Sequence, residues 1–272
     1  MNKNYPLFEE TKISSEMLHK KIMYVAMATF CSIGLQAQNC GGQISDDYSN
    51  AALWTTITTP GSGNTGFPFY TQIAKVDSGM ARIKSPLENW GAQVYRPLNR
   101  TLCDSFVAEI DFTPIFQGNG NSNSFGMVPL ALTAGTLHAN GVRDANNNYT
   151  NSNQDEILVI YTDDGSGSAG VSQRRFSVFI KDGTTRIGLQ RSMHISSVVT
   201  AGASYRIRLE RLGGDFGRLT IINLSDTTLS ASVPFVIPLT VGGLSYVQHV
   251  NSPTGGRPRV ADFSVDNLCI TD

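Results

Sequence analysis

Apolar and polar residues alternate along much of the chain after residue 100. Alternation marks the segments FVAEIDF (106–112), RRFSVFIKDG (174–183) and YRIRLERL (205–212), and it is strict over residues 205–210. The Asp-Gly pair at the end of the second segment favours a β-hairpin, with TRIGLQ (185–190) as the partner strand. A period of two with one polar face predicts antiparallel strands whose apolar face lies on a core.

A different kind of strand is predicted by EILVIYTD (156–163), where five apolar residues follow one another. Such a run is typical of a central strand that is covered on both faces. Further strands are predicted at 69–76, 79–84, 91–97, 125–133, 217–224, 243–249 and 259–270. Because no segment keeps an apolar stripe with helical spacing, the many short strands predict an all-β fold, either a two-sheet sandwich or a barrel.

Three polar segments separate the predicted strands: residues 117–124, the Asn-rich residues 138–153, and residues 163–170. We expect them to be loops at one rim of a sandwich, where binding sites often lie. Half or more of their residues are interpreted as flexible connections without a function. No internal repeat or inter-domain linker is visible, so residues 39–272 predict a single domain.

The chain begins with an N-terminal extension and a predicted signal peptide, which together occupy residues 1–38. A basic HKK motif (19–21) precedes an apolar run of 14 residues (22–35), and polar residues follow at once. The run is too short to cross a bilayer, which needs about 20 apolar residues. A basic start and a short apolar run are typical of a secretory signal. We therefore expect a mature protein that is secreted or held on the outer cell surface, with no membrane insertion.

The charges argue against two classes of partner. The net charge is −1, from 21 basic and 22 acidic residues, and no basic block is present. A nucleic-acid binder or a protein that docks on an anionic membrane would need such a block. The spaced arginines Arg206, Arg208 and Arg211 instead predict a solvated face of a sheet.

Several short phrases of the sequence carry a family resemblance. They are DDYS (46–49), VYRPLNRTLCDSFVAEIDFTP (94–114), LALTAGT (130–136), NQDEILVIYTDD (153–164), YRIRLERL (205–212) and VDNLCI (265–270). Over roughly residues 44–272 the chain resembles the concanavalin A-like lectin/glucanase jelly roll in its laminin G-like form. More narrowly, it resembles modules of bacterial surface proteins exported by the type IX secretion system. The resemblance implies an antiparallel β-sandwich whose first and last strands are neighbours, and it implies that further domains or surface proteins are partners.

The enzymes that share this fold have motifs that are incomplete here. Retaining glycosidases carry Glu-x-Asp-x-x-Glu on one strand, and Pro114 stands where the second Glu would follow Glu109 and Asp111. Proline cannot protonate a leaving group, so the required pair of carboxylates is missing. Polysaccharide lyases use a Gln-x-His phrase, whereas Gln248 and His249 are adjacent and point to opposite faces of a strand. We therefore predict that the protein is not an enzyme.

Sugar-binding sites on sandwiches combine an exposed aromatic ring with polar side chains. Trp90 lies in a turn context and Tyr149 lies in the Asn-rich loop, so both are candidate carbohydrate-binding residues. A ring that only caps the rim of the sandwich is the alternative for Trp90. Trp54, in contrast, is expected to pack in the core or at an edge.

A structural calcium ion is the one cofactor that the sequence suggests. Asp163 and Asp164 start a Gly/Ser-rich loop and offer hard oxygen ligands, and Asp47 with Asp266 forms a second candidate pair. Turn-forming aspartates are the alternative interpretation of Asp163 and Asp164. The four histidines show no metal-ligand spacing.

One disulfide is expected in the mature chain. Cys31 lies within the predicted signal peptide, which leaves Cys40, Cys103 and Cys269. Because the jelly roll implied by the resemblance brings the first and last strands together, we expect Cys40 to pair with Cys269. A Cys103–Cys269 pair and an unpaired Cys103 remain the alternatives.

Three functional hypotheses follow, in order of preference. The first is a carbohydrate-binding or adhesive module without catalytic activity, with a polysaccharide or glycan as its partner. The second is a structural or protein-interaction module of a larger surface protein. The third is a polysaccharide hydrolase or lyase.

Overall fold

The computed structural model describes residues 42–59, 73–85, 91–117, 125–136, 154–164, 173–183, 185–187, 194–200, 202–251 and 261–272. These residues form sixteen β-strands and one turn of 3-10 helix, Ala51–Leu53. They belong to one compact unit, Gly41–Asp272. None of them forms a helix that is long and apolar enough to cross a membrane. The predicted extension and signal peptide, residues 1–38, lie outside the described residues.

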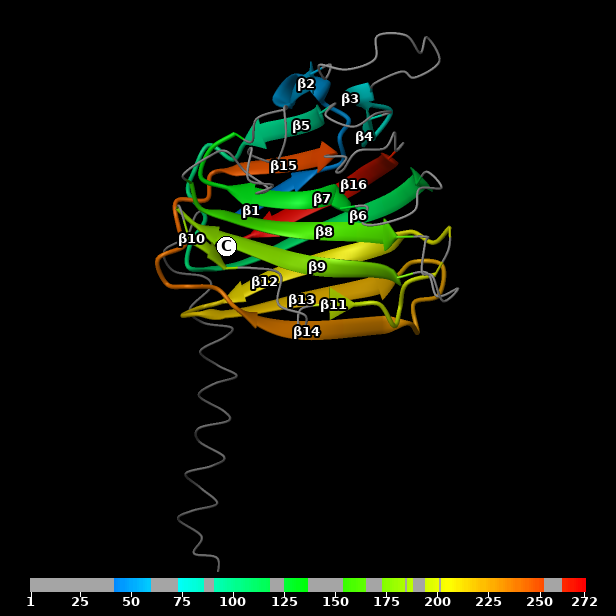
Figure 1. Cartoon of the computed structure of the whole chain (residues 1–272). Helices are drawn as coiled ribbons and strands as arrows, with labels where there is room; N and C mark the ends of the chain where they lie inside the picture. The colour runs from blue at the N-terminus through cyan, green and yellow to red at the C-terminus, as the bar shows by residue number, and fades with distance from the viewer. Residues whose placement is uncertain are drawn as a thin grey trace, which may run out of the picture. The chain divides into compact units, whose positions relative to one another are not determined.

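The described strands form two antiparallel sheets of eight strands each (Figure 1). Sheet A runs in the order β14 (Ser230–Val236), β13 (Phe216–Asn223), β12 (Tyr205–Leu212), β6 (Ser105–Gln117), β16 (Ala261–Thr271), β4 (Met80–Ser85) and β3 (Ile73–Asp77), with β1 (Gln43–Asp46) paired to β16. Sheet B runs in the order β10 (Thr185–Ile187), β9 (Gln173–Asp182), β8 (Glu156–Asp164), β7 (Phe125–Thr133), β15 (Tyr246–Asn251), β5 (Gly91–Pro97) and β2 (Thr55–Thr59), with β11 (His194–Ile195) paired to β9. The predicted all-β, two-sheet sandwich is confirmed.

The first and last strands are neighbours, as the family resemblance implied. β1 pairs with the end of β16, so that Gln43 lies opposite Thr271 and Ser45 lies opposite Cys269. β4 pairs with the other half of β16, and β6 runs along the full length of its opposite side. Arg100 adds a link between the two ends, because its guanidinium contacts the Gly42 carbonyl oxygen at 2.5 Å and the Asp272 carboxylate at 2.8 Å.

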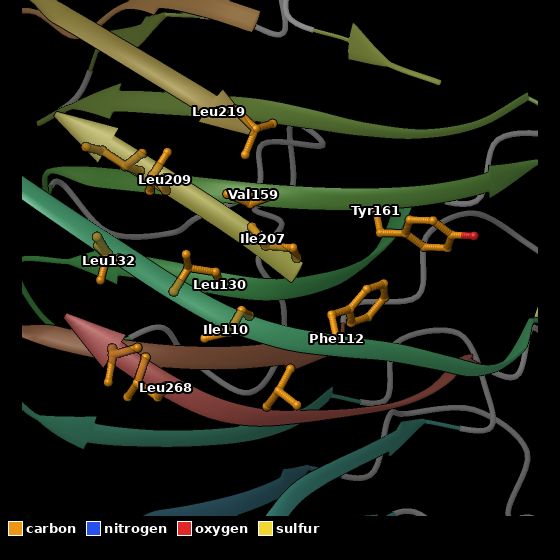
Figure 2. Packing of buried hydrophobic residues seen from close by; sticks show 14 of the residues in the cluster. Ile110, Phe112, Leu130, Leu132, Val159, Tyr161, Ile207, Leu209, Leu219 and Leu268 are labelled. Atoms are coloured by element: carbon orange, nitrogen blue, oxygen red, sulfur yellow. The ribbon is translucent and has the colours of Figure 1, made fainter. Parts of the chain in front are cut away.

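The core lies between the two sheets and is built by the alternation seen in the sequence. Figure 2 shows side chains of both sheets pointing toward one another. Those labelled from sheet A are Ile110, Phe112, Ile207, Leu209, Leu219 and Leu268, and those from sheet B are Leu130, Leu132, Val159 and Tyr161. Phe112 is fully buried, and its ring centroid lies 5.2 Å from that of Tyr161 and 5.7 Å from that of Phe263. Aromatic packing therefore joins the two sheets at this point.

β8 is a central strand covered on both faces, as its continuous apolar run predicted. Residues 157–161 are all buried, and β7 and β9 flank the strand. Ile157, Val159 and Tyr161 belong to the main core, whereas Leu158 and Ile160 belong to a second apolar cluster on the opposite face of sheet B. The outer face of sheet B is therefore partly apolar at its centre.

The outer face of sheet A is charged. Arg206 binds Asp111 through two contacts of 2.8 and 2.9 Å, and Arg208 binds Glu109 at 2.9 Å. The prediction of a solvated face is confirmed for these two arginines but is wrong for Arg211, which is only 2% exposed. Positions 206 and 208 share one face of β12, whereas 211 lies on the inner face and donates to the Val241 carbonyl oxygen at 2.5 Å.

Three strands had no counterpart among the sequence predictions: the two-residue strand β11 and the edge strands β14 and β2. β14 ends sheet A and contains Pro234, whose Cα partner is Arg218 of β13. β2 ends sheet B and consists of four threonines around Ile57. Proline and small polar residues suit edge positions because one side of the strand makes no ladder hydrogen bonds.

Candidate functional site

A surface of partly exposed aromatic side chains lies on the outer face of sheet B, where β2, β5 and β15 run side by side. Tyr95 and Tyr246 are half-buried, and Thr55 and Pro97 beside them are exposed. In the strand register Thr55 lies opposite Tyr95, and Tyr246 lies opposite Pro97, so these four side chains share one face of the sheet. We call Thr55, Tyr95, Pro97 and Tyr246 the tyrosine patch.

The two rings of the tyrosine patch are close together but inclined. Their centroids lie 6.3 Å apart and their planes make an angle of 57°. On either side of Tyr95 the residues Val94 and Arg96 point to the other face, where Val94 is buried in the core. The period of two in the strands therefore aims the tyrosine rings outward. Such a surface offers apolar ring faces and hydroxyl groups to a ligand.

A row of buried amide side chains continues the same face next to the patch. Gln93 Nε2 donates to Gln248 Oε1 across the β5–β15 pair, and Gln248 Nε2 donates to Thr133 Oγ1 and to the Gly135 carbonyl oxygen. Gln93 and Gln248 are both fully buried. Gln93 Oε1 has no hydrogen-bond partner among the described residues, which leaves a buried acceptor two positions from Tyr95. An unpaired buried acceptor costs about 1–3 kcal/mol, which a buried water would recover.

A polar network that includes Asp46 anchors the opposite face of the same strands. Asp46 accepts hydrogen bonds from the Tyr48 backbone N–H at 2.7 Å and from Trp54 Nε1 at 2.9 Å, and it forms an ion pair with Arg96. The Arg96 guanidinium lies 5.7 Å from the centroid of the Trp54 ring. The expectation that Trp54 packs in the core or at an edge is confirmed, because it is 6% exposed and stacks on Tyr48.

His249 lies at the centre of this network and is fully buried. Its Nδ1 donates to the Pro129 carbonyl oxygen at 2.6 Å, since a carbonyl can only accept. The neutral ring then accepts from the Tyr48 hydroxyl, which lies 2.7 Å from Nε2. Burial lowers the pKa of His249 to about 4, although the Pro129 carbonyl and the Asp46 charge favour the protonated form. His249 therefore stays neutral at pH 7 and serves the fold.

The enzyme motifs considered from the sequence are separated in space. Glu109 lies on the outer face of sheet A in an ion pair with Arg208, on the other sheet from the tyrosine patch. Gln248 lies on the outer face of sheet B, while His249 next to it points to the core and binds Tyr48. The prediction that these adjacent residues face opposite ways is confirmed, and they cannot act together on one substrate.

The candidate ligand-binding residues from the sequence are only partly covered by the structure. Trp90 and Tyr149 lie outside the described residues and remain predictions. Asp163 and Asp164 are the last residues of β8, with Arg174 and Gln173 as their Cα partners, so they extend a strand that we expected to end at residue 163. Their side chains lie outside the described part of the structure.

No group of three histidine, cysteine or acidic side chains is arranged to hold a metal ion among the residues that the structure describes. In the second candidate calcium pair, Asp47 and Asp266, burial and neighbouring negative charges disfavour ionisation of one carboxyl group. Burial first, and then the charges of Asp111 and Asp47, raise the pKa of Asp266. Asp111 is already held by Arg206 and by the Asn267 amide at 2.9 Å. The structural calcium ion thus remains a prediction.

The pairing of the cysteines differs from the prediction. Cys269 is a free cysteine, so the predicted Cys40–Cys269 disulfide and the alternative Cys103–Cys269 pair are not formed. The strand order was predicted correctly, but the register places Ser45, five positions after Cys40, opposite Cys269. The thiol of Cys269 accepts a hydrogen bond from Gln43 Nε2 at 3.3 Å. Cys103 is disulfide-bonded, and its partner is outside the described residues.

We predict that Cys40 is the partner of Cys103 in the mature protein. Arg100 holds the Gly42 carbonyl, which brings the segment after Cys40 beside the segment before Cys103. Peptide mapping without reduction should give a Cys40–Cys103 link and an alkylated Cys269. A Cys269→Ser variant should leave that link unchanged. A Cys40–Cys269 link in the unmodified protein would contradict the prediction.

The fold is shared with plant lectins. The chain superposes on lectin II from Ulex europaeus with a TM-score of 0.52 and 9% identity, over 86% of this chain and 99% of the lectin. It also superposes on the lectin UEA-II complexed with galactose (TM-score 0.51, 10% identity, 86% and 99% of the two chains). A third similar structure is the basic winged bean lectin with Tn-antigen (TM-score 0.50, 10% identity, 84% and 96%).

These similarities define the class of fold. The chain is an antiparallel β-sandwich of the legume-lectin type, which is the concanavalin A-like architecture. No protein-family model matches the chain, and no curated protein matches its sequence. At identities near 10% the likeness shows the fold alone.

Proposed function

We propose that the protein is a carbohydrate-binding module, secreted or held on the outer cell surface, which binds a glycan at the tyrosine patch without cleaving it. One observation carries the proposal: two half-buried tyrosine rings share an outer face of a lectin-type sandwich with exposed Thr55 and Pro97. Aromatic rings supply apolar contact to sugar faces, and hydroxyl and amide groups bind sugar hydroxyls. The predicted signal peptide supports an extracellular location.

Removal of either tyrosine ring of the patch should weaken glycan binding and leave the protein folded. Tyr95→Ala and Tyr246→Ala are each expected to lower the affinity for a bound glycan about tenfold or more, because exposed aromatic anchors dominate such sites. Tyr95→Phe and Tyr246→Phe keep the ring and should retain most of the affinity. Isothermal titration calorimetry of the intact protein, with a glycan chosen from an array screen, measures the change.

Thr220→Ala, on the outer face of sheet A, is the matched control and should bind like the unmodified protein. Melting temperatures of all variants show whether each protein is folded. Equal affinity of the two alanine variants and the unmodified protein would remove the tyrosine patch as the binding site.

The absence of catalysis is part of the proposal. Glu109 is paired with Arg208 and Pro114 stands where a second acid is needed, so no proton donor is available on this strand. Incubation with laminarin, cellulose, alginate or agarose should release no reducing ends. Release that disappears in a Glu109→Gln variant would establish a hydrolase instead.

A structural or protein-interaction module is the second candidate function, and one observation favours it. Phe216 and Val236 lie opposite each other on β13 and β14 at the edge of sheet A, and they are 53% and 58% exposed. Exposed apolar pairs of this kind can contact another protein. An array without any glycan signal, together with a stable complex with another surface protein, would favour this candidate.

A further inference from the structure

The strands that carry the tyrosine patch contain almost no charge. β2, β5, β7 and β15 include one arginine or lysine, Arg96, and no acidic residue. Arg96 is engaged on the other face by Asp46 and lies against the Trp54 ring. The described side chains on the outer face of these four strands are therefore all uncharged.

The strands of sheet A, in contrast, carry many charged side chains. Its strands carry ion pairs that join Lys75 to Asp77, Arg82 to Asp262, Arg206 to Asp111, Arg208 to Glu109 and Arg218 to Glu210. Sheet B carries charged residues as well, but on β8, β9 and β10, outside the four strands of the patch. A site for uronate or sulfate groups would place arginine or lysine where the ligand binds, because these groups are held by charge-assisted hydrogen bonds.

The angle between the tyrosine rings adds a geometric restriction. Tyr95 and Tyr246 are inclined by 57°, so their rings cannot lie against one flat surface at the same time. A crystalline polysaccharide presents a flat face and needs coplanar rings to stack on it. Two inclined rings with centroids 6.3 Å apart instead present their faces in different directions, which suits contact with a single chain or a chain end.

Building on the proposed function, we propose that the tyrosine patch selects soluble, neutral glycan chains over anionic polysaccharides and over crystalline polysaccharide surfaces. Exposed Thr55 and the hydroxyls of the two tyrosines provide uncharged hydrogen-bonding groups for sugar hydroxyls. Contact with the ligand comes from the two rings. Because no counterions are displaced from the site, binding is insensitive to salt.

The test compares three kinds of probe with the intact protein. Laminarin, hydroxyethylcellulose and galactomannan are soluble and neutral, alginate and polygalacturonate are anionic, and microcrystalline cellulose presents flat crystalline faces. A glycan array widens the neutral and anionic sets. We expect binding to at least one neutral soluble glycan, at least tenfold tighter than to either anionic polymer. The affinity should change less than twofold between 50 and 300 mM NaCl, and Tyr246→Ala should lose it while Tyr246→Phe keeps it.

Every other result of these binding experiments would contradict a different part of the proposal. Tighter binding to alginate or polygalacturonate that weakens as salt rises would refute selection of neutral chains and leave the carbohydrate-binding function standing. Retention on microcrystalline cellulose alone would refute the restriction from the inclined rings. If the protein binds none of the probes and no glycan on the array, the proposed function itself is refuted. Neutral binding that both tyrosine-to-alanine variants retain would show that selection occurs elsewhere on the molecule.

Discussion

Phe112→Ala is expected to lower the free energy of unfolding by about 3–5 kcal/mol, the usual cost of deleting a buried aromatic ring. The Phe112 ring is fully buried and lies at the contact between the sheets, with Tyr161 and Phe176 of sheet B on one side and Tyr205 and Phe263 of sheet A on the other. Four aromatic neighbours cannot all move to fill the space that the ring leaves. Urea denaturation followed by circular dichroism measures the loss.

The matched control lies three residues further along the same strand. Ile115 is 46% exposed, and Ile115→Ala should change the free energy of unfolding by no more than about 0.5 kcal/mol. A similar loss in both variants, or a loss below about 1 kcal/mol for Phe112→Ala, would mean that this aromatic cluster does not hold the sheets together.

Acid should destabilise the protein through His249. Burial lowers its pKa in the folded state to about 4, compared with about 6.5 in an unfolded chain. A base whose pKa is lowered by folding contributes its full stability above pH 6.5, and that contribution falls as the pH drops toward 4. A shift of this size corresponds to about 3 kcal/mol, because the unfolded state binds the proton more readily. Urea denaturation at intervals from pH 7.5 to 4 measures the decline.

Two variants separate His249 from the carboxylates that also titrate in acid. His249→Phe removes the titrating ring, so its stability should fall by about 3 kcal/mol less than that of the unmodified protein between pH 6.5 and 4. Tyr48→Phe removes the hydroxyl that donates to Nε2 but leaves the ring buried, and it should keep the acid-dependent decline. Parallel pH curves for His249→Phe and the unmodified protein would assign the acid sensitivity to other groups.

The fold was predictable because alternation along a strand is set locally. β5 and β7 have the bounds that the sequence predicted, Gly91–Pro97 and Phe125–Thr133. The unpredicted β2 and β14 are edge strands with few buried side chains, since among their described side chains only Phe235 of β14 is buried, so the sequences TTITT and SASVPFV lack the usual signal.

The binding surface could not be predicted from the sequence in the same way. Tyr95 and Tyr246 are 151 positions apart, and they meet because β5 and β15 pair. Each tyrosine stands at an outward position of its strand, but the pairing between these two distant strands could not be read from the sequence. The cysteines show the same division. The resemblance implied that β1 and β16 are neighbours, but it did not give the register that places Ser45 opposite Cys269.

Pro234 also affects how the protein behaves in concentrated solution. The exposed edge of a sheet offers unpaired N–H and C=O groups on which another chain can extend the sheet, and this is a common start of aggregation. Proline has no N–H, so the row of donors along β14 is interrupted in its second half. A polymer that grew by adding strands to this edge would lose a hydrogen bond at every junction. One residue in an edge strand thus makes the addition of strands at this edge of the sandwich less favourable.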